Sequence, residues 1–377
     1  MIINFDKAAT TKLRKEVLEE MLPYLEDYYG NASSMYRIGQ KSKGVIESSR
    51  TKIAELLNCK ATEIYFTSGG TESDNWAIKG VADTFQNKGR HIITTKIEHH
   101  AVLHTMEFLE SRGYEVTYLN VDGEGFVDLK ELENSIRNDT ILISVMYANN
   151  EIGTIEPIET ISEIAKRRNI LFHVDGVQAL GNIKIDLEKL NVDLMSFSGH
   201  KVNGPKGIGI LYVKNGTKIT PLIHGGTQER GKRAGTENVA GIVGLGKAIE
   251  CAVENLEEKR VQLLPLRDKL IEDLTSIKGI VLNGPILKRL PGNVNISIEG
   301  VKSQELLIFL DMKNICASSG SACTTGSIEP SHVLKAIGLN DDLAKNSLRL
   351  SLDYENTFEE VETVTNILKD AIITLRR

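Results

Sequence analysis

The distribution of apolar residues along the chain predicts an alternating α/β fold over its first two thirds. Short β-branched or apolar runs alternate with longer stretches of helical periodicity, and these runs lie at residues 63–68, 91–96, 115–121, 141–146, 170–175, 193–198 and 208–213. Such alternation is typical of a mainly parallel sheet with helices on both faces. Runs that are apolar almost throughout, such as "ILISVM", indicate strands buried on both sides. We therefore expect an α/β fold with a mainly parallel, seven-stranded sheet.

The pattern changes near residue 238. Apolar residues three or four apart predict a long helix over 238–276, with a bend or break at Pro265. Further on, the chain predicts strands at 279–284, 293–299 and 347–352 and helices at 303–314 and 357–376. This order predicts a large α/β domain over residues 15–255 and a smaller α+β domain made of 1–14 and 256–377.

Composition and charge exclude several classes of protein. With 377 residues and 41% hydrophobic content, the chain can bury large cores. The formal net charge of -6 and the interspersed cations predict no nucleic-acid partner. Four cysteines without a CxxC pair favour a reducing cytoplasm over a disulfide framework. The N-terminus lacks the apolar core of a signal peptide, and no run has the length of a membrane span, so we expect a cytoplasmic protein without a membrane partner.

A glycine-rich turn follows the first predicted strand, and ligands of open α/β sheets bind at the carboxyl ends of strands. Gly69 and Gly70 would let the backbone approach a ligand, and Thr71 would open a helix whose N–H groups favour a phosphate. The Thr71-to-Asp74 spacing resembles a capping box. The alternative is an ordinary strand-to-helix turn. The turn matches neither the P-loop nor the GxGxxG pattern, which argues against a nucleoside triphosphate or a dinucleotide.

Two charged residues at other strand ends point to a cofactor. Asp175 ends the apolar run "ILFHVD", where a buried carboxylate calls for a cationic partner. Lys201 lies among small residues in "SGHKVNG", with Ser198 and His200 beside it, and resembles the Schiff-base lysine of pyridoxal phosphate enzymes. A lone lysine is usually a solvated surface charge. One cofactor, however, accounts for the lysine, the aspartate and the phosphate-type turn together.

The stretch "CASSGSACTTGS", residues 316–327, surrounds Cys323 with small and polar residues. A buried structural thiol needs apolar neighbours, so the stretch indicates either a loop, at about 318–328, that carries a reactive thiol or a plain surface cysteine. His100 and His104 are four residues apart and could share a helical face. Without a HExxH glutamate or a nearby cysteine ligand, they do not predict a metal site.

Seven segments in a fixed order make the chain recognisable: "TSGGTESDN", "EHHAV", "NNEIG", "HVDGVQ", "SGHKVNGPKG", "ERGKRAGTEN" and "SSGSACTTGS". Over essentially its whole length, the chain resembles the NifS/IscS family of cysteine desulfurases, in the class V branch of fold-type I pyridoxal phosphate transferases. The resemblance implies a homodimeric, pyridoxal 5'-phosphate-dependent enzyme that converts L-cysteine to L-alanine. The sulfur would leave as a persulfide on Cys323 for an acceptor protein in iron–sulfur cluster assembly or in transfer-RNA or cofactor thiolation.

The resemblance also implies roles for individual residues. Lys201 would hold the cofactor and move the α-proton of the substrate, and His99 would stack on the pyridine ring. Asp175 would pair with the ring nitrogen, and Arg349 would bind the substrate carboxylate. The other cofactor contacts would come from Gly70, Thr71, Ser198 and His200 at the phosphate, from Asn150 and Gln178 at the phenolic oxygen, and from Thr236 of the second subunit at the phosphate.

The chain departs from the family at four positions. The family commonly has tyrosine or asparagine in place of Lys7, proline in place of Ala32, and histidine in place of Tyr36 and of Asn203. Because of these departures, the resemblance does not assign the residues of the substrate pocket or the identity of the sulfur acceptor. One alternative function is that of a selenocysteine lyase or another class V lyase or transaminase. Another is a non-catalytic sulfur carrier or scaffold, against which the intact Lys201 argues.

Overall fold

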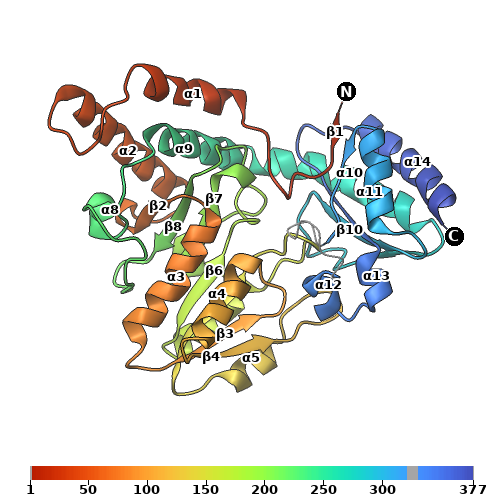
Figure 1. The fold of residues 1–377 in the computed structure, drawn as a ribbon, viewed down its shortest axis with the longest axis horizontal. Helices are drawn as coiled ribbons and strands as arrows, with labels where there is room; N and C mark the ends of the chain where they lie inside the picture. Colours follow the sequence, from red (N-terminus) through yellow and green to blue (C-terminus); the bar gives the residue numbers. More distant parts are fainter. Residues whose placement is uncertain (1, 321–329, 377) are drawn as a thin grey trace.

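A seven-stranded sheet forms the centre of the chain within the residues that the computed structural model describes, 2–320 and 330–376 (Figure 1). Its strands, in their order across the sheet, are β2 (Ile64–Thr67), β8 (Gly209–Val213), β7 (Leu194–Ser198), β6 (Leu171–Asp175), β5 (Thr140–Met146), β3 (His91–Thr95) and β4 (Glu115–Leu119). Strand β8 runs antiparallel to both β2 and β7, and the other neighbours are parallel. The expected mainly parallel sheet is confirmed.

Both faces of this sheet are buried, as its apolar strands predict. In β3 and β5, Ile92 and Leu142 pack on one face, whereas the adjacent Ile93 and Ile143 pack on the other. The first face is covered by α3 (Gly70–Phe85) and α4 (His100–Glu110). The second face is covered by α1 (Lys15–Glu26), α2 (Arg37–Leu56), α5 (Leu129–Ser135), α6 (Ile158–Arg167), α7 (Leu187–Leu190) and α9 (Val239–Glu254). Two short helical elements connect these parts of the fold. The first, η1 (Ala61–Glu63), precedes β2, and the second, α8 (Gln228–Gly231), precedes α9.

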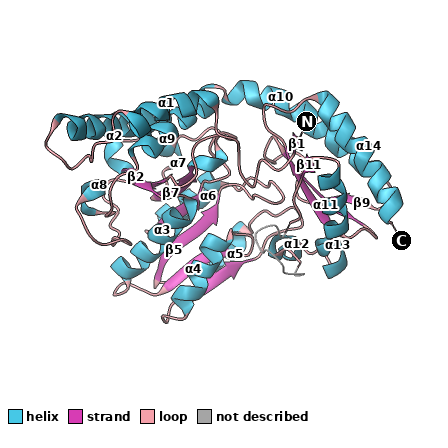
Figure 2. Ribbon diagram, turned by 45° about the horizontal axis from the view of Figure 1, so that its top comes forward, coloured by secondary structure: helices cyan, strands magenta, loops and turns pink. Residues whose placement is uncertain are grey.

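The C-terminal elements form a separate apolar core. An antiparallel three-stranded sheet of β12 (Ser347–Ser351), β10 (Asn293–Ile298) and β9 (Ile280–Leu282) packs with α10 (Leu256–Thr275), α11 (Ser303–Met312) and α14 (Phe358–Leu375). The N-terminal strand β1 (Ile3–Asn4) pairs with β11 (Ile315–Cys316) (Figure 2). Phe5, which follows β1, lies in this second core. These cores support our proposal that residues 15–255 form one domain and that 1–14 and 256–377 form the other.

A third apolar cluster joins these two parts. Val333 and Leu334 of the short helix α12 (His332–Ala336) pack against Ile97, Met146 and Ile152 from the edge of the large sheet. Helix α13 (Asp341–Lys345) follows and leads into β12. The packing of α12 therefore brings the residues after position 330 to the carboxyl end of β5.

The predicted long helix over 238–276 is two helices, and its break is not at Pro265. The break falls at Asn255, whose side-chain amide donates to the carbonyl of Cys251 at 2.7 Å and so satisfies one of the last carbonyls of α9. Pro265 lies inside α10. The expectation of a break at Pro265 is therefore wrong, and a bend at this residue within α10 stays a prediction. Among the described helices, none combines the length and the apolar character that crossing a lipid bilayer requires.

Candidate active site

A cavity of about 300 Å³ opens at the carboxyl ends of β5, β6 and β7. The predicted site residues other than Thr236 and Cys323 all line it: Gly70, Thr71, His99, Asn150, Asp175, Gln178, Ser198, His200, Lys201 and Arg349. They come from five separate segments at the ends of strands of the large sheet and from β12 of the C-terminal part. The fold thus brings together residues that are up to 279 positions apart, Gly70 and Arg349 (349 − 70 = 279).

Of the two remaining predicted residues, Thr236 does not line this cavity in the single chain. Thr236 is solvent-exposed in the segment before α9, and its expected contact with the phosphate requires a second subunit. Cys323 lies outside the described residues. Both roles stay predictions.

The turn after β2 is built for a close approach of the backbone. Gly69 precedes α3 with φ +152°, a conformation that favours glycine, and makes no side-chain cap hydrogen bond. A Cβ on Gly70 would come within 2.7 Å of a Val177 methyl group. Because α3 begins at Gly70, Thr71 already lies inside the first turn, and the expected capping box with Asp74 is wrong. The N–H groups of this first turn face the carboxyl ends of the strands, where the cavity lies, and can donate hydrogen bonds to an anion.

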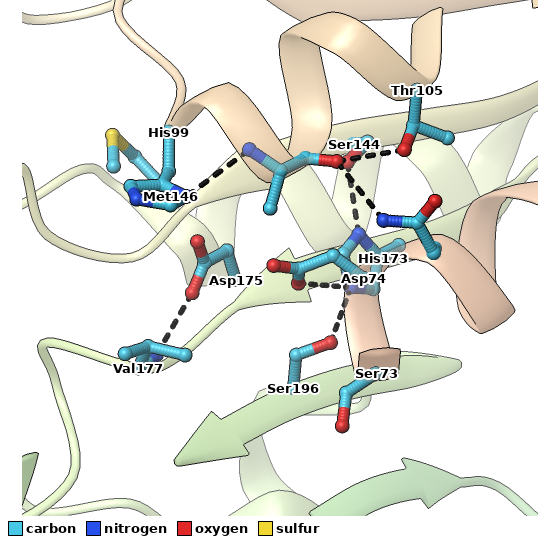
Figure 3. Close-up of polar contacts among 12 residues, drawn as sticks. Ser73, Asp74, His99, Thr105, Ser144, Met146, His173, Asp175, Val177 and Ser196 are labelled. Carbon is cyan, nitrogen blue, oxygen red and sulfur yellow. Dashed lines mark hydrogen bonds and ion pairs between the residues drawn. The ribbon is translucent and has the colours of Figure 1, made fainter. Parts of the chain in front are cut away.

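Asp74, instead of capping the helix, lines the cavity and belongs to a buried polar cluster (Figure 3). One of its carboxyl oxygens lies 3.6 Å from Nε2 of His173, whose ring also contacts the hydroxyls of Ser144 at 2.9 Å and Ser196 at 3.0 Å. Burial lowers the pKa of His173 to about 3, so the ring is neutral. Burial and the nearby Asp175 raise the pKa of Asp74 well above its usual value. Because the His173 ring is neutral, it forms no ion pair with Asp74.

Asp175 is the second acidic group that lines the cavity. It ends β6, and one of its oxygens accepts the N–H of Val177 at 2.9 Å. Burial raises the pKa of Asp175 to about 6, while the bond from Val177 and the charge of Lys201 act in the opposite direction. At neutral pH, Asp175 is thus largely a buried carboxylate, and a cation placed against it would be stabilised.

Lys201 is held at the cavity by the N-terminal segment. Its ammonium group donates to the carbonyls of Ala8 at 2.6 Å and Ala9 at 2.9 Å. Asn203, one of the departures from the family, helps to hold this segment. Its side-chain amide donates to the carbonyl of Lys12 at 3.1 Å, and its backbone has the left-handed φ of +59° that asparagine tolerates. Asn203 therefore has a structural role, because it helps to hold the N-terminal segment that contacts Lys201.

His99 and Arg349 are also fixed by their neighbours. His99 is the N-cap of α4, and its Nδ1 accepts the N–H of Ala101 at 3.1 Å. Burial, followed by the charge of Lys201, lowers the pKa of His99 to about 4, so the ring is neutral with its proton on Nε2. Arg349 is 4% exposed and donates to Asp6 at 2.8 Å and to the carbonyl of Asn150 at 3.3 Å. Its buried Nε makes no hydrogen bond within the described residues.

Sequence reasoning missed the polar cluster around Asp74. Its signal was present, because His173 and Asp175 are two residues apart and so share one face of β6.

The His100 ring stacks on His104 and tilts against His332, with centroids 4.9 Å apart in both pairs. Within residues 2–320 and 330–376, no three His, Cys, Asp or Glu side chains are arranged to hold a metal ion.

Comparison with known proteins agrees with this geometry. The sequence model of the aminotransferase class-V family matches residues 3–364. The chain belongs to this family. A cysteine desulfurase IscS from Methanosarcina thermophila is 56% identical to it over 374 residues, which cover 99% of this chain and 93% of the relative. This similarity confirms the NifS/IscS resemblance that the motifs indicated.

Two solved structures are similar to the whole fold. A NifS-like protein superposes with a TM-score of 0.93 at 43% identity and covers 100% of this chain and 99% of its own. The protein SspA in complex with cysteine has a TM-score of 0.83 at 38% identity, with coverage of 93% of this chain and 99% of its own. The expected fold class, a fold-type I transferase of the class-V branch, is confirmed.

Proposed function

We propose that the protein is a pyridoxal 5'-phosphate-dependent cysteine desulfurase. It converts L-cysteine to L-alanine and passes the sulfur, as a persulfide on Cys323, to an acceptor protein. The observation that carries this proposal is the convergence of Lys201, Asp175, His99 and Arg349 on one cavity at the N-terminus of α3. The printed names of the relatives, and the cysteine bound to SspA, support L-cysteine as the substrate.

The residues of the cavity fit the cofactor. The uncapped first turn of α3, with Ser198 and His200, would hold the phosphate. Asp175, a buried carboxylate that needs a cation, would pair with the protonated ring nitrogen. Asn150 and Gln178 would hydrogen-bond the phenolic oxygen, and the neutral His99 ring would lie on the ring face. When bound, pyridoxal phosphate supplies an electron sink for the negative charge that develops on the substrate.

Three side chains of the cavity have separate roles in the proposed reaction. Arg349 binds the substrate carboxylate, because its buried Nε and the adjacent Nη2 form a face suited to a bidentate acceptor. Lys201 takes the α-proton, for which its ammonium group must first lose a proton despite its contacts with the Ala8 and Ala9 carbonyls. Asp175 keeps its negative charge throughout and so retains the proton on the ring nitrogen.

Sulfur transfer requires a thiolate on Cys323. The thiolate attacks the sulfur of the substrate, the Cβ–S bond breaks as the S–S bond forms, and the electron pair of the broken bond stays with the carbon skeleton, which takes up a proton. Alanine leaves, and the persulfide passes to the acceptor or is reduced to sulfide. We propose that the acceptor acts in iron–sulfur cluster assembly or in thiolation of transfer RNA or a cofactor, in the cytoplasm.

We also propose a homodimer. Apolar side chains are exposed on α1 and the segment that follows it, namely Leu18, Leu22, Leu25, Tyr29, Met35 and Tyr36. Leu222 and Ile223, in the segment that leads to Thr236, are also exposed. Exposed apolar groups of this size on a single chain are typical of an interface between subunits.

The function is tested by incubating the purified protein with L-cysteine and a reductant and measuring sulfide and alanine together. We expect equal amounts of both and loss of both in Cys323→Ser, whereas Lys201→Ala should also lose the absorption of the bound cofactor. Alanine release from L-cysteine that survives Cys323→Ser, or release of alanine and selenide by this variant when L-selenocysteine is supplied instead, would favour a selenocysteine lyase or another class V lyase. A colourless, inactive wild-type protein would favour a sulfur carrier or scaffold.

A further inference from the structure

The helix turn that would hold the cofactor phosphate also carries a carboxylate, for which the function proposed above has no role. The first backbone hydrogen bond of α3 runs from the N–H of Ser73 to the carbonyl of Gly69 at 3.1 Å, so the N–H groups of residues 70–72 precede it and can donate to an anion. Glu72 lies in this same first turn. Its negative charge would repel a phosphate on the turn unless a cation compensates for it.

Arg233 is the cation paired with Glu72. Its Nε donates to Oε1 of Glu72 at 2.9 Å and its Nη2 donates to Oε2 at 3.1 Å, which is the bidentate geometry of an arginine–carboxylate pair. The Glu72 side chain is 10% exposed and the Arg233 side chain is 21% exposed, so water screens the pair only in part. Burial raises the pKa of Glu72, but the hydrogen bonds from Arg233 and Ser68 bring it below its usual value. Glu72 is therefore ionised at neutral pH.

Glu72 also holds the backbone that leads into the turn. Its Oε2 accepts the N–H of Ser68, the residue before Gly69, at 2.7 Å. One carboxylate thus contacts both the entry to the phosphate turn and the guanidinium of Arg233. Arg233 itself does not line the cofactor cavity in the single chain. Any effect of Arg233 on the cofactor must therefore pass through Glu72.

The arginine comes from a distant segment of the chain. It lies 161 positions after Glu72 and three before Thr236, in "GKRAGTEN". Two residues further on, the N–H of Gly235 donates to the side chain of Gln228 at 3.2 Å, which helps to fix this segment. The ion pair therefore connects the start of α3 with the segment that carries Thr236.

We propose that Arg233 is a positioning residue of the cofactor site, which compensates for the charge of Glu72 and so allows the first turn of α3 to bind the phosphate. The proposal rests on the pyridoxal phosphate-dependent function proposed above. An ordinary ion pair at a helix start would contribute only to stability. The proposal differs from that alternative, because loss of Arg233 should weaken phosphate recognition only while Glu72 keeps its charge.

Titration of the full-length apoprotein with pyridoxal 5'-phosphate, followed by the absorption of the bound cofactor, tests this dependence. In Arg233→Gln, Kd should rise by about ten-fold or more, because the unpaired Glu72 carboxylate repels the phosphate. In Glu72→Gln, which keeps an acceptor for Ser68, Kd should not rise. The double variant should stay within about three-fold of wild type, because neither charge remains. Pyridoxal, which lacks the phosphate, should bind to wild type and Arg233→Gln equally well.

Two further variants complete the design. Arg233→Lys keeps the positive charge without the bidentate bonds, so its loss of affinity should be smaller than that of Arg233→Gln. Arg167→Gln is the matched control, because it removes a more exposed ion pair, with Glu133 at 2.9 Å, and should bind the cofactor like wild type. Melting temperatures of the apoproteins identify an unfolded variant. If Arg233→Gln does not fold, Arg233→Lys replaces it, and Glu72→Gln must then reverse the smaller loss.

Three results would overturn the proposal. The first is an unchanged Kd for pyridoxal phosphate in Arg233→Gln. The second is a double variant as weak as Arg233→Gln, since Arg233 would then act on the phosphate directly or on the fold alone. The third is an equal loss of pyridoxal binding, which would exclude a phosphate-specific effect. A wild-type protein that does not bind pyridoxal phosphate would instead overturn the proposed function.

Discussion

At the scale of single residues, two buried acids line the cavity in different surroundings, Asp74 and Asp175. Burial and the nearby Asp175 raise the pKa of Asp74, whereas the N–H of Val177 and the charge of Lys201 oppose the effect of burial on Asp175. Neighbouring carboxyl groups in different surroundings can have different tasks. With a pKa of about 6, Asp175 is largely ionised at neutral pH and can pair with a cation.

Replacing Asp175 should remove cofactor function and leave the fold intact. In Asp175→Asn, the amide cannot stabilise a protonated ring nitrogen, so we expect desulfuration to fall by about a hundred-fold or more. Cofactor absorption and its response to L-cysteine should change in the same variant, while the melting temperature of the apoprotein stays close to that of wild type. Asp83→Asn, an exposed site on the same helix as Asp74, serves as the control. Full activity in Asp175→Asn would contradict the assignment.

Glu98 makes the stability of the protein depend on pH. Its Oε2 is buried without a hydrogen bond in the described residues, and burial raises its pKa to about 8. Between the unfolded pKa near 4.5 and about 8, the native state therefore holds a proton that the unfolded state releases, so stability falls as pH rises through this window. We therefore compare the effect of Glu98→Gln on the free energy of unfolding at two pH values. This effect should be more stabilising at pH 8 than at pH 5, by roughly 2 kcal/mol. Urea titrations at the two pH values measure this, and an equal effect at both would contradict it.

At the scale of elements, the segment before α9 is held in an unusual conformation. Glu229 and Arg230 are consecutive non-glycine residues with φ values of 48° and 56°. Both oxygens of Glu229 accept from Arg50 of α2 at 2.7 Å, and one also accepts the N–H of Phe66 on β2 at 2.9 Å. This buried ion pair compensates for the backbone strain and connects α2, β2 and the segment that carries Thr236.

Removing one partner of this pair should strongly destabilise the protein. In Arg50→Ala, the buried Glu229 loses its counter-charge, so we expect a loss of about 3–5 kcal/mol in the free energy of unfolding. The exposed Arg260→Ala is the control and should change stability by less than about 1 kcal/mol. Denaturant unfolding of the apoprotein gives both values. A loss in Arg50→Ala as small as that of the control would mean that the pair is not buried in solution.

At the scale of the whole molecule, residues distant in sequence meet at the cavity. The N-terminal segment pairs with β11 and also supplies the carbonyls that contact Lys201. Helix α12, late in the chain, packs on the edge of the large sheet near β5. The cavity is therefore sensitive to how the two parts of the chain are packed together.

The proposed dimer can be tested by subunit complementation. Each site should combine Lys201 of one subunit with Thr236 of the other, so Lys201→Ala and Thr236→Ala chains in a mixed dimer would form one intact site. We expect the mixture, after subunit exchange, to be more active than either variant alone. Sedimentation equilibrium should give twice the chain mass. An active monomer, or a mixture no better than the Thr236→Ala protein, would contradict shared sites.

Much of the fold and site could be predicted from local sequence patterns. The seven strands could be predicted because each is a short run rich in β-branched or apolar residues, and Asp175 and Lys201 could be predicted because each lies at or just after the end of such a run. The start of α3 was misjudged because Gly69 can serve as N-cap without a side chain, which puts Thr71 inside the helix. The break at Asn255 was missed because a side-chain bond to Cys251 ends the helix where no proline marks it.

The sequence by itself determined the kind of sheet, the family and the chemical groups of the cavity, because periodicity and fixed motifs are properties of neighbouring residues. Only the tertiary structure decided which acids are neutral and which residues support the site. Asp74 meets His173, and Asp6 and Ser318 meet Arg349, across separations that no local pattern encodes. Their pKa values and contacts depend on burial and on the packing of distant segments, and these exist only in the folded chain.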